Sequence, residues 1–238
     1  MARFARVVVP GYPYHVTHRG NRRQTIFGDP DDREVYLAML QQYAAHYALD
    51  VWAYCMMTNH VHLLVVPQHE QSMANAIGRA HMRYARWYNR QHGWSGHLWA
   101  NRFFSTVLDP EHLWHAVRYV EANPVRARMV TRAADYEWSS CPAHSGLTTP
   151  HSILASARPF PGHIGTSSWS DWIDTALPTP VEGALRVNTS TGRPTGSQGF
   201  VMNLEELLER QLHRQKAGRK PKTPAPDATP DLFENLNA

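Results

Sequence analysis

The sequence predicts an α+β fold: a four-stranded antiparallel sheet of the split βαβ, ferredoxin-like type, with an added helix and a C-terminal helical extension. Between residues 12 and 123, patterns typical of strands and helices follow in the order strand, helix, strand, strand, helix, strand, helix. Only Thr58 and Asn59 separate the second and third strands, which favours an antiparallel hairpin. A chain of 238 residues that is 42% apolar can also bury a substantial core.

The first strand and the first helix are predicted from the N-terminal residues. Residues 12–18 (YPYHVTH) alternate as a strand does, and a basic loop, RGNRRQ, follows. Asp29 then begins a helix, because it can cap the first turn, Pro30 fits that turn, and the acids that follow lie at the positive end of the helix dipole. Its tyrosines and leucine form one stripe, which must pack on a sheet or on another helix.

The remaining elements follow the hairpin, whose strands are residues 51–57 and 60–66. Residues 72–91 form a helix with an apolar face and an arginine-rich face, and residues 102–108 form the fourth strand. Pro110 begins a third helix, which must end near Asn123 because the residue before Pro124 is steered away from helical dihedral angles. Ser197 caps a last helix that is expected to end near Arg214.

Changes in composition divide the chain into four parts. Residues 1–144 are predicted to form one domain, and residues 145–185, rich in Ser, Thr, Pro and Gly, a crossover lying on it, with Trp169 and Trp172 as anchors. A helical segment is expected over residues 186–215. The basic, proline-rich residues 216–238 are expected to be disordered, and they hold all three lysines.

Charge and cysteine usage narrow the classes of function. The net charge is +4, but residues 76–133 hold nine arginines against three acids, a pattern that suits phosphate recognition or a solvated surface. Cys55 and Cys141 have neither a disulfide nor a zinc pattern and are expected to be buried. No apolar run is long enough to cross a membrane or to act as a secretory signal, so no membrane partner and a cytoplasmic location are predicted.

Two histidines lie on one strand of the hairpin. Side chains alternate along a strand, so His60 and His62 point to the same face, with Cα atoms about 6.5 Å apart. Neutral imidazoles are good ligands for divalent metals, and a pair on one strand supplies two coordination positions. The other interpretation is a structural histidine pair.

A tyrosine and an asparagine share one face of the third helix. Tyr119 and Asn123 are four residues apart, one turn from each other. A phenol can act as a nucleophile, and an amide oxygen can bind a metal. The alternative is a half-buried aromatic side chain and a helix cap before proline.

Together these residues resemble the HUH single-tyrosine transposase family, specifically its REP-associated tyrosine transposases. The similar segments are YHVTHRGNRRQTIF, MMTNHVHLLVVP, GHLWANRFFSTVLD, RYVEANPVRA and YEWSSCPAH, in this order between residues 10 and 144. The segment TGRPTGSQGF also looks like the longer members. The resemblance implies the HUH nuclease fold for residues 1–144.

The resemblance implies an enzyme, a metal-dependent endonuclease and strand transferase for single-stranded DNA. Tyr119 would attack the scissile phosphate and form a 5′-phosphotyrosine intermediate. His60, His62 and Asn123 would hold the divalent cation, Mg²⁺ or Mn²⁺. Related insertion-sequence transposases commonly have glutamine where this chain has Asn123, and the shorter side chain reaches less far.

The partner that the resemblance implies is hairpin DNA of the REP type, with single-stranded DNA at its foot, bound by a monomer or a weak homodimer. Arginines for phosphates and aromatic rings for stacking suit such a ligand. The predicted DNA-binding residues are Arg19, Arg22, Arg23, Arg79, Arg83, Arg86, Arg90, Trp87, Tyr88 and Trp99.

Three other functions share part of this pattern of residues. A histidine-triad nucleotide hydrolase would need a third histidine where the chain has Leu64. A ferredoxin-like RNA-binding module without catalysis would lack a use for the tyrosine helix. A domesticated transposase that binds hairpins without cutting them keeps the same residues and stays open.

Overall fold

The computed structural model describes residues 5–156, 159, 161 and 164–213. In this part of the chain a four-stranded sheet is formed by β1 (Tyr14–Arg19), β2 (Leu49–Met57), β3 (His60–Pro67) and β4 (Phe104–Val107). The strand order is β2-β3-β1-β4, and all neighbouring strands are antiparallel. The predicted α+β fold with a four-stranded antiparallel sheet is therefore confirmed, in the strand order of the split βαβ arrangement.

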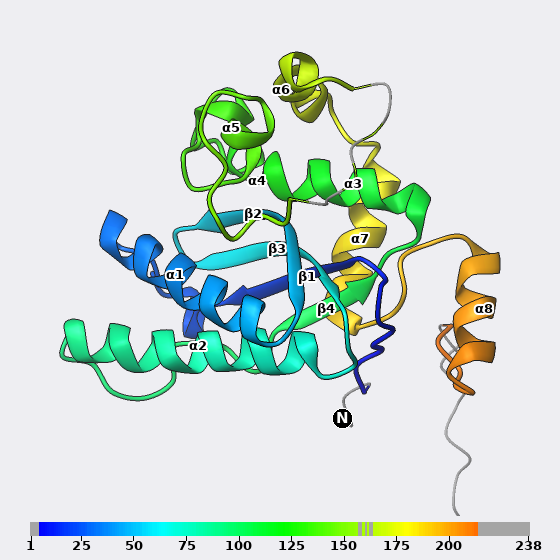
Figure 1. Cartoon of the computed structure of the whole chain (residues 1–238), viewed down its shortest axis with the longest axis horizontal. Coiled ribbons are helices and arrows are strands. Elements are labelled where there is room, and N and C mark those ends of the chain that lie inside the picture. The colour runs from blue at the N-terminus through cyan, green and yellow to red at the C-terminus, as the bar shows by residue number, and fades with distance from the viewer. Residues whose placement is uncertain (1–4, 157–158, 160, 162–163, 214–238) are drawn as a thin grey trace, which may run out of the picture.

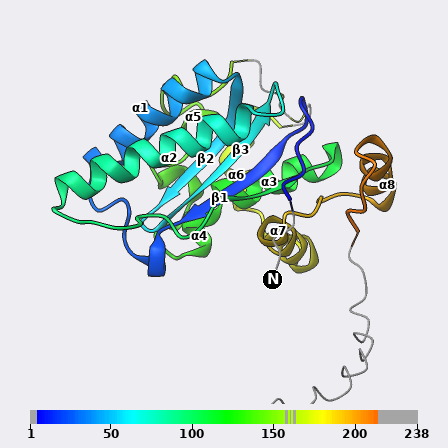
Figure 2. The ribbon, with the colours of Figure 1, turned by 90° about the horizontal axis from the view of Figure 1, so that it is seen from below.

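Helices cover both faces of the sheet (Figures 1 and 2). One face packs on α1 (Pro30–His46) and α2 (Ser72–Gln91), and the opposite face packs on α3 (Pro110–Glu121), α4 (Asn123–Arg126) and α7 (Thr179–Thr191). Further elements are η1 (Asn21–Arg23), η2 (Ala133–Asp135), α5 (Cys141–His144), α6 (Thr166–Asp174) and α8 (Gln198–Leu207). Two hydrophobic cores, one on each face, result from this layering.

The alternation of β3 assigns its side chains to the two cores. Val61, Leu63 and Val65 belong to the core shared with α1 and α2. His60 and His62 therefore point to the opposite face, where α3 lies. In the sheet, His62 is opposite Thr17 of β1, and this register aligns the histidines with the side chains of β1 that share their face.

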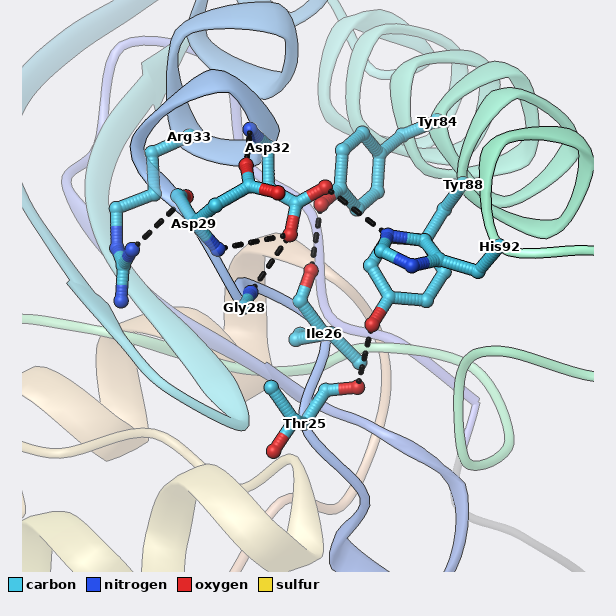
Figure 3. A network of polar contacts seen from close by, with 9 residues as sticks. All are labelled: Thr25, Ile26, Gly28, Asp29, Asp32, Arg33, Tyr84, Tyr88 and His92. Carbon is cyan, nitrogen blue, oxygen red and sulfur yellow. Dashed lines mark hydrogen bonds and ion pairs between the residues drawn. The ribbon is translucent and has the colours of Figure 1, made fainter.

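The start of α1 is fixed as the sequence predicts (Figure 3). The Asp29 carboxylate accepts a hydrogen bond from Asp32 N at 2.8 Å, and Asp32 Oδ2 accepts from Gly28 N and from Asp29 N, which makes a capping box. Two tyrosines of α2 hold the preceding loop: Tyr84 Oη donates to Ile26 O at 2.5 Å and Tyr88 Oη donates to Thr25 O at 3.2 Å. The loop and the two helices are thus one hydrogen-bonded unit.

The structure differs from the sequence prediction between residues 145 and 215. The expected crossover contains α6 and most of α7, and the expected boundary at residue 185 falls inside α7. Trp169 is buried as an anchor. Ser197 does cap α8, accepting from Phe200 N at 3.2 Å, but α8 ends at Leu207 and not near Arg214. The tail predicted over residues 216–238 lies outside the described residues.

The predictions about the two cysteines and about membrane-spanning segments can also be compared with the structure. Cys55 and Cys141 are both buried with free thiols, as predicted. Within the described ranges, no helix combines the length and the apolar character that a membrane span requires.

Candidate active site

A cavity of about 490 Å³ lies between the sheet and the helices α3, α4 and α7. It brings together the residues that the sequence separated: His60 and His62 of β3, Tyr119 of α3 and Asn123 of α4. Its other lining residues are His15, Thr17, Arg19, Phe104, Arg126, Ala127, Arg186, Thr189 and Ser190. We call this space the tyrosine cavity.

A chain of hydrogen bonds fixes the tautomer of His62. Thr189 Oγ1 donates to Leu185 O at 2.7 Å, so this oxygen is free to accept from His15 Nδ1, 2.7 Å away. His15 Nε2 then carries the lone pair and accepts from His62 Nδ1 at 2.9 Å. The remaining nitrogen of His62, Nε2, is left with its lone pair available for a ligand.

The preceding residue, Asn59, fixes the tautomer of His60 in the same way. The amide of Asn59 is fixed because Asn59 Nδ2 donates to Arg23 O at 3.1 Å. Asn59 Oδ1 therefore accepts from His60 Nδ1 at 2.7 Å, which leaves His60 Nε2 unprotonated. Both histidines of β3 thus keep the nitrogen that a metal would bind.

Burial keeps these imidazoles neutral. It lowers the pKa of His60 to about 4, with Arg19 adding to the effect, and it lowers the pKa of His62 well below the usual value, with His15 and His60 contributing. A neutral imidazole is the form that binds a metal, so no proton has to be removed at neutral pH.

The donor set fits a divalent cation with open coordination positions. Asn123 Nδ2 is buried with no hydrogen-bond partner among the described residues, and a rotation of the amide would place Oδ1 at that position instead. No group of three His, Cys, Asp or Glu side chains in the described ranges is arranged as a metal site. Two imidazoles and one amide leave coordination positions for phosphate oxygens and water, as Mg²⁺ and Mn²⁺ require.

Tyr119 lies against the histidines and an arginine. Its ring is 8% exposed and packs edge-on at centroid distances of 5.4 Å from His15 and 5.7 Å from His62. The guanidinium carbon of Arg126 lies 4.1 Å from the Tyr119 ring centroid, and Arg126 Nη2 donates to Tyr119 O at 2.6 Å. A cation therefore lies over the Tyr119 ring, where it can also attract a bound phosphate.

A buried carboxylate anchors the helix that carries Tyr119. Glu121 is fully buried and accepts hydrogen bonds from Ser140 Oγ and, at 2.7 Å, from Trp169 Nε1, while His144 Nδ1 lies 2.6 Å away. His144 and these hydrogen bonds lower the pKa of Glu121 although burial alone would raise it. The contacts tie α3 to α5 and α6 and so fix the rotation of the tyrosine helix.

Several residues of the tyrosine cavity were not predicted from the sequence. They are His15, Thr17, Phe104, Arg126, Arg186, Thr189 and Ser190. The alternation of the first strand could have indicated His15, which lies two residues before Thr17 on the same face as His62. The three residues from α7 had no such signal, because nothing in their segment indicates which face of the sheet it covers.

The predicted DNA-binding arginines fall into two groups. Arg19 lines the tyrosine cavity, and Arg22 and Arg23 are exposed in η1, which follows β1 directly. The arginines of α2 are exposed on the opposite face of the sheet. There Arg83 Nη1 donates to Tyr43 Oη at 3.4 Å, and the guanidinium carbon of Arg79 lies 5.5 Å from the Tyr47 ring, so both point toward α1.

The aromatic residues predicted to stack on bases are largely internal. Tyr88 is 2% exposed and bonded to the loop before α1 (Figure 3), and Trp87 is half-buried against Tyr84 at a centroid distance of 5.7 Å. Trp99 is 8% exposed, and its Nε1 donates to His81 O at 2.9 Å. Tyr88 presents no ring face to a ligand, because its ring packs against Tyr84, His92 and Trp94.

Comparisons with known proteins agree with this architecture. Residues 8–123, slightly less than half of the chain, match the family described as Transposase IS200 like. A solved REP-associated tyrosine transposase bound to a REP hairpin aligns with a TM-score of 0.51 at 16% identity, over 69% of this chain and 97% of that chain. At this identity the likeness speaks for the fold. No curated protein matches significantly.

A second solved structure, a putative transposase from Deinococcus radiodurans R1, aligns at 22% identity over 50% of this chain and 96% of that chain. Its TM-score of 0.36 is too low to speak for a shared fold. The family match ends at Asn123 and includes the histidine pair of β3 and Tyr119. Over residues 8–123, the chain is therefore similar to the IS200-like transposase family.

Proposed function

We propose that the protein is a metal-dependent endonuclease and strand transferase of the HUH type, which cuts REP-like hairpin DNA on its single-stranded side through a 5′-phosphotyrosine intermediate. The observation that carries this proposal is the tyrosine cavity. It holds one phenol beside two neutral imidazoles whose Nε2 atoms are available, one amide, and two arginines, Arg19 and Arg126. The match of residues 8–123 to the IS200-like transposase family and the solved REP-associated transposase bound to a REP hairpin support the choice of substrate.

In this proposal the nucleophile is Tyr119. Its Oη forms a bond to the scissile phosphorus, the bond from phosphorus to the 3′-oxygen breaks, and the 3′-oxygen takes up a proton as the phenol gives one up. One phosphodiester replaces another, so the step conserves bond energy and is reversible on a second 3′-hydroxyl. A free phenol has a pKa of about 10 and is a poor nucleophile at neutral pH, so the step needs nearby positive charge.

The positive charge comes from two sources. Arg126 lies 4.1 Å from the Tyr119 ring, and Arg19 lines the same cavity. A divalent cation held by His60, His62 and Asn123 would polarise the scissile phosphate and neutralise the charge that builds on its oxygens. His15 and Thr189 hold His62 in the tautomer that this role requires.

The proposal is tested by incubating a labelled hairpin that has a single-stranded flank with the wild-type protein and Mn²⁺. A covalent protein–DNA adduct is expected on a denaturing gel. The Tyr119→Phe variant should form none, since it lacks the nucleophilic oxygen. Tyr47→Phe serves as the matched control, because Tyr47 lies at the end of α1 on the opposite face of the sheet.

Two results would contradict the proposal. Cleavage that persists in Tyr119→Phe would exclude this tyrosine as the nucleophile. Hairpin binding by the wild type without any cleavage in Mn²⁺ or Mg²⁺ would identify a binding protein instead of a nuclease.

A further inference from the structure

A second cavity, of about 570 Å³, lies on the other face of the sheet from Tyr119. One wall is α2, which contributes Gly78, His81, Met82 and Arg86, and the other is the segment before β4, from Gly96 to Phe103. His18 and Arg6 complete the lining near the sheet. The proposed catalytic residues do not use this space, which we call the second cavity.

The inner wall of the second cavity is aromatic and uncharged. His18 Nε2 donates to Asn101 O at 3.1 Å, so His18 Nδ1 accepts from His81 Nδ1 at 2.7 Å, and His81 Nε2 accepts from Tyr36 Oη at 2.9 Å. Burial lowers the pKa of His18 to about 4 and that of His81 well below its usual value. Every ring nitrogen of this pair is thus used internally, so the pair lines the cavity without adding charge to it.

Trp99 extends this surface. Its ring stacks on His18 and on His81, at centroid distances of 4.5 Å and 4.4 Å. Met82, which is 47% exposed, and Phe103 also line the cavity. A flat apolar ligand can therefore lie against aromatic and thioether groups.

The outer part of the second cavity is cationic. Arg6, Arg86 and Arg102 line it, and none of the described residues that line it carries a carboxylate. The Arg6 guanidinium lies 3.7 Å from the Phe103 ring centroid, and burial and the nearby Arg102 lower its pKa to about 10. Three arginines around an apolar floor match a ligand with one aromatic part and one phosphate.

The second cavity and the tyrosine cavity have adjacent lining residues at the start of β4. Phe103 lines the second cavity and Phe104 the tyrosine cavity, and the Cα atoms of consecutive residues are about 3.8 Å apart. Ala100 N also donates to Arg19 O at 2.8 Å, which joins the segment before β4 to the end of β1. β4 is an edge strand, and Arg102 and Phe104 are exposed there.

We infer that the second cavity binds an unpaired nucleotide of the DNA strand that Tyr119 attacks, with the base against Trp99 and Met82 and a phosphate at the arginines. The strand would pass from the tyrosine cavity around the exposed end of β4, over Arg102 and Phe104. This inference rests on the proposed function, since it assigns the single-stranded flank of the same substrate. Base stacking on aromatic side chains is tolerant of sequence, so the flank is held whatever its base.

The test is a substitution in α2 that places a larger side chain in the second cavity. A Cβ added at Gly78 meets no atom within 4 Å, and leucine favours a helix more than glycine does, so Gly78→Leu should fold and occupy the cavity. Gly199→Leu in α8 is the matched control, because Gly199 also has open space and lies outside both cavities. Affinity is measured by fluorescence anisotropy for two hairpins, one with a single-stranded flank and one blunt.

Gly78→Leu should weaken binding of the flanked hairpin about tenfold and leave binding of the blunt hairpin unchanged. Arg86→Ala should weaken the same hairpin selectively, whereas Gly199→Leu should bind both as the wild type does. In the wild type, 2-aminopurine placed at successive flank positions should show stacking at one position, and Gly78→Leu should abolish that signal.

Four outcomes would overturn the inference. The first is that Gly78→Leu binds the flanked hairpin with wild-type affinity, and the second is that it loses as much affinity for the blunt hairpin as for the flanked one. The third is that 2-aminopurine shows no stacked flank position in the wild type. The fourth is that free deoxynucleoside monophosphates compete for the site with the same affinity as the single-stranded flank. The assay for the covalent protein–DNA adduct tests the proposed function independently of these affinity measurements. If the adduct forms while the flank does not use the second cavity, only this inference fails, and if no adduct forms, the proposed function fails.

Discussion

At the scale of the residue, the candidate site depends on the tautomer and the orientation of His62. Its tautomer follows from a chain of three groups, Thr189, His15 and His62, which comes from α7, β1 and β3. The bond between His15 and Thr189 joins residues 174 positions apart. The histidine pair could be predicted from strand alternation, but a contact of this range cannot be read from any local pattern.

Thr189→Val tests this chain. The substitution removes the oxygen that accepts from His15 Nδ1, so His15 loses its fixed tautomer and His62 its fixed orientation. Mn²⁺ affinity should fall about 10- to 100-fold, the usual range for groups that orient a metal ligand, as measured by calorimetric titration. Thr191→Val is the control, since Thr191 Oγ1 bonds within α7 only. Unchanged Mn²⁺ affinity in Thr189→Val would show that the chain does not orient His62.

At the scale of the element, α3 is placed by its start and by its buried face. Asp109 caps α3 by accepting from His112 N at 2.7 Å, and it also accepts from Ser197 N at 2.8 Å, so the starts of α3 and α8 share one carboxylate. Near the other end of α3, Glu121 bonds to groups of α6 and of the segment that leads into α5. Tyr119 is thus carried by a helix fixed at both ends.

Some helices could be predicted from the sequence and others could not, and the two groups differ in what stabilises them. Asp29, Pro110 and Ser197 mark the starts of α1, α3 and α8 by local capping, which a sequence shows directly. α6 and α7 are rich in Ser and Thr, which favour caps and turns over helix interiors. Their stability comes from packing of Trp169, Ile173 and Leu185 on α3 and the sheet, and composition does not reveal such packing.

Glu121→Ala tests the anchor of α3. It leaves Trp169 Nε1, Ser140 Oγ and His144 in a buried site without the carboxylate, so the free energy of unfolding should fall by about 3–5 kcal/mol in urea titrations. Glu182→Ala is a surface comparison, since its contact with Arg126 Nε is 3.7 Å long and partly exposed, and it should cost at most about 1 kcal/mol. An equally small loss in Glu121→Ala would contradict the anchoring role.

At the scale of the whole molecule, arginines gather at the end of the sheet where the two cavities have adjacent lining residues. Arg19 lines the tyrosine cavity, Arg102 lines the second cavity, and the exposed Arg22 and Arg23 follow β1. The arginine-rich stretch of α2 indicated phosphate recognition, but the sequence did not reveal that α2 covers the face opposite Tyr119. Of its arginines, Arg86 lines the second cavity, whereas Arg79 and Arg83 point toward α1.

The salt dependence of the affinity for hairpin DNA should distinguish these two groups of arginines. The double variant Arg22→Ala with Arg23→Ala should reduce the slope of log affinity against log salt concentration by about 2, because two phosphate contacts are lost. Arg79→Ala with Arg83→Ala removes the same charge from the opposite face and should leave the slope near the wild-type value. Hairpin binding measured across a salt series gives both slopes. Equal slopes in the two double variants would show that the end of the sheet does not bind phosphates preferentially.

The most direct test of the account is the identity of the covalent link. Wild-type protein is incubated with Mn²⁺ and hairpin DNA labelled on either side of the cut, and the adduct is digested and sequenced by mass spectrometry. The account predicts that the DNA attached to the protein is joined through its 5′-phosphate to Tyr119, and that the released strand ends in a 3′-hydroxyl. Attachment to another residue, or through a 3′-phosphate, would contradict it.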